Sequence, residues 1–135
     1  MKASRFPREY RVFNLEENRM MKPAELESVG FSIAPNGLPV FREKPFDCVV
    51  MWRTNNKDKR GHFLFEGDIC KLAIKNEFGS LSVDYAIMRW VESANAFILQ
   101  IPMKGVQQLL DVTDVERLGN EFEHAELREL VADVV

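Results

Sequence analysis

Residues 57–70 of the chain, KDKRGHFLFEGDIC, decide its fold. They contain a polar turn, a short apolar strand, a tight acidic turn and the beginning of a second strand. Gly67 stands between two acidic residues, and glycine readily takes the backbone conformations that tight turns require. The stretch therefore predicts a β-hairpin, but by itself it indicates no chemistry.

The segments that follow this hairpin alternate at the two-residue period of β-strands. A strand expected over residues 69–75 carries apolar side chains on one face: Cys70, Leu72 and Ile74. The longer strand expected over residues 81–90 has two faces, made of Ala86, Met88 and Trp90 on one side and Tyr85, Ile87 and Arg89 on the other. Residues 97–101 continue the pattern until Pro102, so this region predicts an antiparallel meander.

The sequence before the hairpin predicts further short strands. Residues 46–52 give the strongest strand signal, because four consecutive apolar residues at their end favour burial on both faces. A polar turn is expected over residues 54–61. Nearer the N-terminus a helical turn is expected over residues 23–27, and short strands are expected over residues 10–13, 31–34 and 38–41.

The C-terminal part predicts a strand and then a helix. Residues 103–114 fit either a helix face or an extended segment, and residues 115–120 favour a short strand. The tail over residues 124–131 is rich in helix formers, and its apolar stripe consists of Leu127, Leu130 and Val131. This stripe fits packing on the chain's own sheet, and it equally fits contact with a neighbouring subunit.

These segments together predict a mainly β protein: a coiled antiparallel sheet or small β-barrel with minor helices, including a C-terminal helix. The 135 residues suit one domain. We expect a hairpin-rich N-terminal part at about 8–45, a barrel-like core at about 46–102, and a C-terminal strand and helix at about 112–132.

Composition predicts a cytoplasmic protein rather than a membrane or secreted one. No apolar run approaches the roughly 20 residues of a membrane-spanning helix, and the N-terminus lacks the apolar region of a secretory signal. Cys48 and Cys70 form no close motif, so we expect reduced thiols, with a single disulfide as the alternative.

The net charge of −3 hides an asymmetry between the two parts of the chain. Residues 1–60 carry 12 Lys and Arg against 8 Asp and Glu, whereas residues 61–135 carry 6 against 13. The two parts could attract each other within one molecule or head-to-tail between molecules, or the charges could simply coat a solvated surface.

Four stretches carry a family resemblance: residues 10–20 (YRVFNLEENRM), residues 50–61 (VMWRTNNKDKRG) running into residues 65–69 (FEGDI), residues 88–97 (MRWVESANAF) and residues 115–127 (VERLGNEFEHAEL). In order and spacing they resemble the motifs of the YopX family of bacteriophage and prophage proteins. The chain departs from the family pattern at Asn55, where glycine is usual, and at Ala125, where proline is usual.

The resemblance implies a mainly β, coiled-sheet domain encoded by a phage or prophage genome. It also implies a cytoplasmic protein that often associates with itself. It carries over no catalytic residue and no cofactor.

Glu66 and Asp68 are the close carboxylate pair of the family-motif turn, with Gly67 between them. At positions i and i+2 of an extended segment they would lie roughly 6–7 Å apart, which suits general acid–base work or an oxygen-ligand ion site. The alternative, which we favour, is that both carboxylates accept backbone N–H bonds around the turn.

His62 and His124 have no histidine or cysteine partner at the spacing of a metal site, so we predict no metal centre. No phosphate-binding glycine loop or nucleophile motif is present. The best nucleic-acid candidate is a cluster of cations near Trp52 and Phe63: Arg53, Lys57, Lys59 and Arg60. The acidic overall balance favours a solvated turn instead.

The leading hypothesis is therefore a non-enzymatic phage accessory protein that acts through protein–protein contacts, as a homo-oligomer, without cofactor or membrane. The alternative is a small-barrel nucleic-acid-binding module that uses the basic turn over residues 53–60. A third reading is a hydrolase or ion-dependent activity centred on Glu66 and Asp68.

Overall fold

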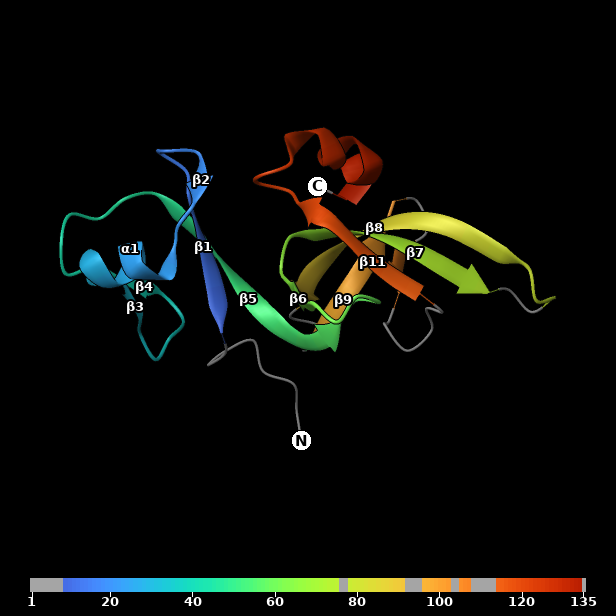
Figure 1. The fold of residues 1–135 in the computed structure, drawn as a ribbon, viewed down its shortest axis with the longest axis horizontal. Helices are drawn as coiled ribbons and strands as arrows, with labels where there is room; N and C mark the ends of the chain where they lie inside the picture. Colours follow the sequence, from blue (N-terminus) through green and yellow to red (C-terminus); the bar gives the residue numbers. More distant parts are fainter. Residues whose placement is uncertain (1–8, 76–77, 92–95, 103–104, 108–113, 135) are drawn as a thin grey trace.

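The computed structural model is built mainly of antiparallel strands (Figure 1). It describes residues 9–75, 78–91, 96–102, 105–107 and 114–134. The first sheet has the order β2-β1-β5-β6. Its strands are β1 (Tyr10–Asn14), β2 (Arg19–Met20), β5 (Cys48–Lys57) and β6 (Phe63–Phe65).

The second sheet has the order β10-β9-β8-β7-β11, and every neighbouring pair is antiparallel. Its strands are β7 (Asp68–Lys75), β8 (Leu81–Val91), β9 (Ala96–Ile101), β10 (Gly105–Gln107) and β11 (Asp114–Asn120). The turn between β6 and β7 joins the two sheets, as Figure 1 shows. The hairpin predicted from residues 57–70 is wrong, because β6 pairs with β5 whereas β7 pairs with β8 and β11.

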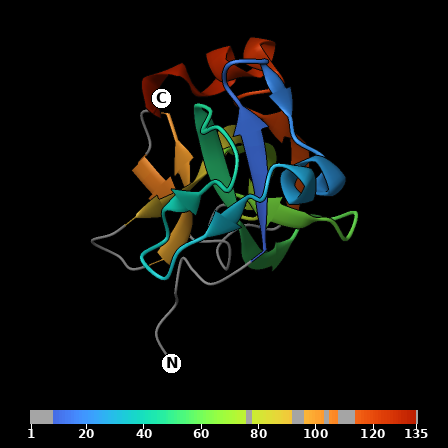
Figure 2. The same cartoon turned by 90° about the vertical axis from the view of Figure 1, so that its left-hand side faces the viewer.

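A small N-terminal layer covers the first sheet. It consists of α1 (Pro23–Ser28) and the hairpin of β3 (Ser32–Ile33) with β4 (Pro39–Val40). In Figure 1 these elements lie at the left-hand end of the molecule, and Figure 2 views the molecule from that end. The cluster beneath them is centred on Val12, Met21 and Phe31, and the Phe31, Phe41 and Phe46 rings follow one another edge to face.

The main core lies on one face of the second sheet. Cys70 and Leu72 of β7, Ala86 and Met88 of β8, and Leu64 of β6 are all buried there. The opposite face of the same strands holds a second cluster, in which Ile69, Ile87 and Tyr85 meet the C-terminal helix. The alternation predicted for residues 69–75 and 81–90 is thus confirmed on both faces, because successive side chains of a strand point to opposite sides.

The C-terminal helix is η3 (Ala125–Val134), a 3-10 helix whose backbone breaks at Val131. The prediction of a mainly β protein with a curled antiparallel sheet and minor helices is confirmed. No helix among the described residues is both long enough and apolar enough to cross a membrane.

The structure corrects the predicted turn over residues 54–61. β5 continues to Lys57, and its pairing with β6 shifts between Arg53 and Lys57. Thr54 is buried, and its hydroxyl oxygen accepts the backbone N–H of Asn56 at 3.1 Å. Thr and Asn resemble turn residues because their side chains bond to nearby backbone, and here such a bond forms inside an irregular strand.

Candidate functional site

The turn Glu66-Gly67-Asp68 joins β6 to β7 at the junction of the two sheets. Gly67 has a φ of +82°. Its N–H donates to the carbonyl of Met88 at 2.9 Å, and its carbonyl accepts the N–H of Glu121 at 3.0 Å. The turn is therefore tied both to β8 and to the loop that follows β11.

Both carboxylates of this turn accept backbone N–H groups. Glu66 Oε1 accepts the N–H of Trp52 at 3.1 Å, and Asp68 Oδ2 accepts the N–H of Phe65 at 2.7 Å. The two side chains serve different strands instead of converging on one space. This is the turn-forming arrangement, and it leaves the pair poorly placed to share an ion or a proton.

Asp68 also forms an ion pair across the two sheets. Its Oδ1 lies 2.6 Å from Arg11 Nη2, and the Asp68 side chain is fully buried. The Arg11 guanidinium lies over the Phe65 ring, 4.1 Å from its centroid. Burial raises the pKa of Asp68 above its usual range, and the Arg11 charge acts in the opposite direction.

A second buried carboxylate, Asp58, holds the basic turn. Its Oδ1 accepts the N–H groups of Arg60 and His62, both at 3.0 Å, and its Oδ2 accepts the N–H of Arg117 at 3.2 Å. Burial acts to raise the pKa of Asp58, but these backbone donors outweigh it, so the pKa lies below its usual range. Asp58 thereby fastens the turn to β11.

The structure brings Arg53 and Lys57 together over one aromatic ring. The Arg53 guanidinium lies 4.1 Å and the Lys57 Nζ 4.9 Å from the centroid of Phe63. Arg53 Nη1 also lies 3.4 Å from Glu9 Oε2. The cation and the aromatic surface that a nucleic acid would use therefore contact each other.

Lys59 and Arg60 face the acidic side of β11. Lys59 Nζ lies 3.2 Å from Glu116 Oε2 and 3.6 Å from Asp114 Oδ2, and Arg60 Nη2 lies 3.9 Å from Glu116 Oε2. The hydrogen bond from Lys59 stabilises the charged carboxylate of Glu116 and so lowers the pKa of Glu116. Carboxylates of the same chain thus already neutralise this pair of cations.

The apolar stripe of the tail divides into two parts. Val131 is fully buried against Ile69 and Ile87, and Leu127 packs on the same cluster. The Val131 side chain therefore lies in the chain's own core. Leu130 is the exposed member of the three, at 37%.

The two histidines lie on the same side of the molecule but play different parts. His62 is exposed, with Nδ1 3.9 Å from Asp58 Oδ1. His124 Nδ1 accepts the N–H of Asn120 at 3.1 Å. Within the described ranges, no three His, Cys, Asp or Glu residues are grouped as a metal would require, and both cysteines are free thiols.

Sequence reasoning missed Arg11, Asp58 and Arg117 as site residues. Arg11 stands in a strand with alternating polarity, and Asp58 stands in a turn, so both look like ordinary solvated residues. Their partners lie 57 and 59 positions away, and no local pattern marks such pairs.

We predict that Gly67→Ala destabilises the protein more than Gly61→Ala. Both glycines have a positive φ, +82° and +86°, so both changes carry the backbone strain of about 1–2 kcal/mol. At Gly67 a Cβ would also meet Glu121 Oε1 at 3.3 Å and Met51 Sδ at 3.4 Å, whereas at Gly61 it would meet nothing within 4 Å. Urea unfolding measures both free energies; equal losses would contradict a packed turn at Gly67.

We predict that Asp58→Asn lowers the free energy of unfolding by about 1–3 kcal/mol at pH 7, because an amide accepts through one oxygen only and leaves a backbone donor unpaired. The pKa of Asp58 is lowered on folding, so its stabilisation is present above about pH 4 and is lost as the pH falls further. The difference from wild type should therefore narrow between pH 5 and pH 2 in urea unfolding.

The control for this experiment is Asp47→Asn, at an exposed carboxylate. It should change the unfolding free energy by less than about 0.5 kcal/mol both at pH 7 and between pH 5 and pH 2. An Asp58→Asn difference that stays constant as the pH falls would contradict a role for the Asp58 charge.

Comparison with known proteins agrees with this architecture. The family model described as YopX protein matches residues 9–129. The X-ray crystal structure of protein YopX from Bacillus subtilis aligns with a TM-score of 0.53 and 19% sequence identity, covering 94% of this chain and 96% of that chain. A search of curated proteins found no match. The family match spans most of the sequence, and the chain therefore belongs to the YopX family.

Proposed function

We propose that this chain is a non-enzymatic phage or prophage protein that acts in the host cytoplasm through protein–protein contacts, as a homo-oligomer. The proposal rests on an uncovered apolar surface of the second sheet. This surface is the β7–β8 arm, which we define as residues 73–75 and 78–83. In Figure 1 the arm extends beyond the other elements.

The arm exposes apolar side chains to solvent. Phe78 is 85% exposed, Leu81 63% and Val83 55%. In the antiparallel register Val83 lies opposite Ala73 and Leu81 lies opposite Lys75. Contiguous exposed apolar surface is uncommon on a monomeric protein and marks interaction sites.

The exposed apolar side chains that β8 contributes to the arm lie on the same face of β8 that η3 covers farther along the strand. Leu81 and Val83 alternate in phase with Tyr85 and Ile87, which η3 covers. The apolar face of β8 is thus longer than the helix that packs on it.

A second copy of the chain fits the exposed part best. Two arms that meet face to face would bury the same apolar residues from both subunits, which is the self-complementary contact of a two-fold dimer.

The alternative of a nucleic-acid-binding module through Arg53, Lys57, Lys59 and Arg60 has less support. Arg53 contacts Glu9, and Lys59 and Arg60 contact Glu116. Phosphates would have to displace these partners. The backbone bonds of Glu66 and Asp68 likewise argue against an acid–base or ion-dependent enzyme at the motif turn.

We predict that wild-type protein sediments as an oligomer at tens of micromolar and that the double variant Leu81→Ser with Val83→Ser sediments as a monomer. The change removes apolar area from the arm and leaves the two buried clusters intact. Sedimentation velocity measures the mass, and circular dichroism checks that the variant stays folded.

The matched control is Leu38→Ser, at a side chain that is 61% exposed but lies between β3 and β4. It should leave the oligomer unchanged. A wild-type protein that remains monomeric at several hundred micromolar would contradict self-association, and a control that dissociates equally would contradict the arm as the contact.

A further inference from the structure

A polar pocket of about 300 Å³ lies beside the Arg11–Asp68 ion pair. Its walls come from β1, the turn after β5, β11 and the segment that leads into η3. Five of its lining residues are basic or imidazole side chains: Arg11, Arg60, His62, Arg117 and His124. We infer that this pocket binds the phosphate group of a small phosphorylated molecule.

The cations of the pocket outnumber its carboxylates. Three arginines face two acidic residues, Asp68 and Glu123. Asp68 is fully buried and paired with Arg11, and Glu123 Oε1 accepts a hydrogen bond from Asn120 Nδ2 at 2.9 Å. Arg60 lies 3.9 Å from Glu116, outside the pocket, so Arg117 is the pocket arginine that no carboxylate of the described residues pairs with.

Arg117 is the cation that the protein leaves available. Its backbone N–H is bonded to Asp58, but its guanidinium has no hydrogen bond or ion pair with any residue that the structure describes. Its charge acts on Asp68 from beyond ion-pair distance. A guanidinium that lines a pocket without a carboxylate partner is suited to an anionic ligand.

The Arg11 guanidinium is held in position at the pocket by two contacts. Asp68 binds one of its terminal nitrogens, and the Phe65 ring lies against its plane. Its Nε is buried and has no hydrogen-bond partner among the residues that the structure describes. An orphaned donor of this kind is costly.

The wall formed by His124 is also fixed. Because His124 Nδ1 accepts the N–H of Asn120, the neutral ring carries its hydrogen on Nε2. Gly119 packs directly against this ring, where a Cβ would lie 2.5 Å from Nδ1. The irregularity of β11 between Arg117 and Gly119 brings both residues to the pocket.

The size and shape of the pocket favour a small ligand over a polymer. A volume of about 300 Å³ is at the lower end of small-molecule sites. Non-specific binding of nucleic acid uses an extended basic groove with stacking aromatics, and here the neighbouring cations Lys59 and Arg60 are paired with Glu116. A phosphomonoester, with one dianionic group and a small remainder, matches the arginine forks.

The test is isothermal titration calorimetry with inorganic phosphate and with adenosine monophosphate as a model phosphomonoester. Wild-type protein should bind both. Arg117→Gln should weaken both affinities by about tenfold, because a charge-assisted hydrogen bond is lost. Arg117→Lys should weaken them less, because the charge stays. Arg117 suits the test since its guanidinium forms no hydrogen bond or ion pair with any described residue.

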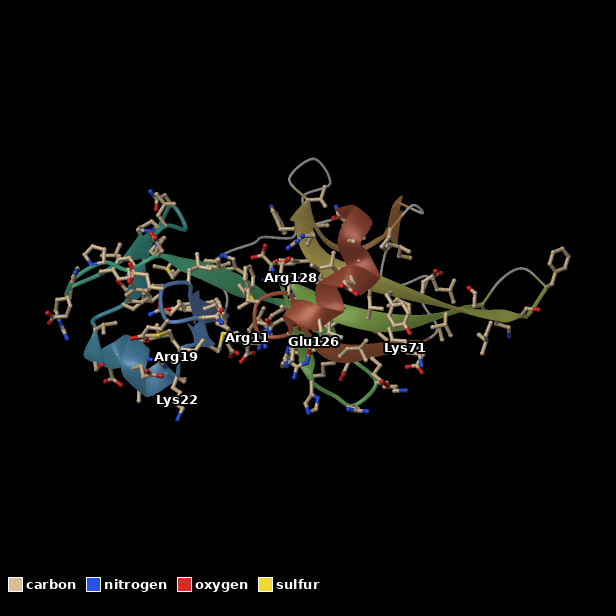
Figure 3. All side chains as sticks on the ribbon, turned by 90° about the horizontal axis from the view of Figure 1, so that it is seen from above. Arg11, Arg19, Lys22, Lys71, Glu126 and Arg128 are labelled. Atoms are coloured by element: carbon tan, nitrogen blue, oxygen red, sulfur yellow. The ribbon has the colours of Figure 1, made fainter. Side chains whose placement is uncertain are left out.

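The matched control is Lys71→Gln, which removes one positive charge from the same sheet outside the pocket. In Figure 3 Lys71 lies farther toward the β7–β8 end than Arg11. Its affinities should stay within about twofold of wild type, because surface charges act weakly through water and salt. Equal weakening by Lys71→Gln and Arg117→Gln would overturn the site, since it would show only general charge attraction.

Two further outcomes would also overturn the inference. One is no heat of binding from either anion at tens of millimolar. The other is that the protein binds neither small anion but does bind a single-stranded oligonucleotide, with the same affinity whether or not the strand carries a 5′-phosphate. A preference for the 5′-phosphorylated strand together with binding of both small anions would support a phosphomonoester site.

Discussion

The arrangement of the two sheets depends on the ion pair between Arg11 of β1 and Asp68 of β7. A fully buried carboxylate is unfavourable by itself, and burial accordingly raises the pKa of Asp68. Arg11 and the N–H of Phe65 offset part of this cost. Removal of one partner of such a pair typically costs about 3–5 kcal/mol, so the two sheets are strongly constrained to meet at this point.

This constraint accounts for the hydrogen bonds of the Glu66-Gly67-Asp68 turn. Asp68 joins the sheets, Glu66 holds the N–H of Trp52, and both backbone groups of Gly67 are bonded to neighbouring segments. These contacts give the three residues of the turn a structural role at the junction of the two sheets. A motif can thus distinguish a family because of a folding constraint, and its acidic residues need not indicate catalysis.

Local periodicity predicted most of the strands, because the alternation of residues 69–75 and 81–90 is a property of neighbouring residues. It failed at residues 54–57, where the bonding of Thr54 suits a bulged strand as well as a turn. Local periodicity could not predict which charged side chains pair with one another. The turn cations and the carboxylates of β11 are more than 50 residues apart, and one sequence contains no signal that Lys59 meets Glu116.

The cations around β11 look alike in the sequence but differ in their partners. Glu116 faces Lys59 and Arg60 and neutralises them, while its neighbour Arg117 lines the pocket beside Arg11. The basic cluster that was conspicuous in the sequence is therefore largely paired, and an arginine that was inconspicuous has no partner in the described chain. The availability of a charge, and not its presence, decides where an anion can bind, and availability depends on tertiary contacts.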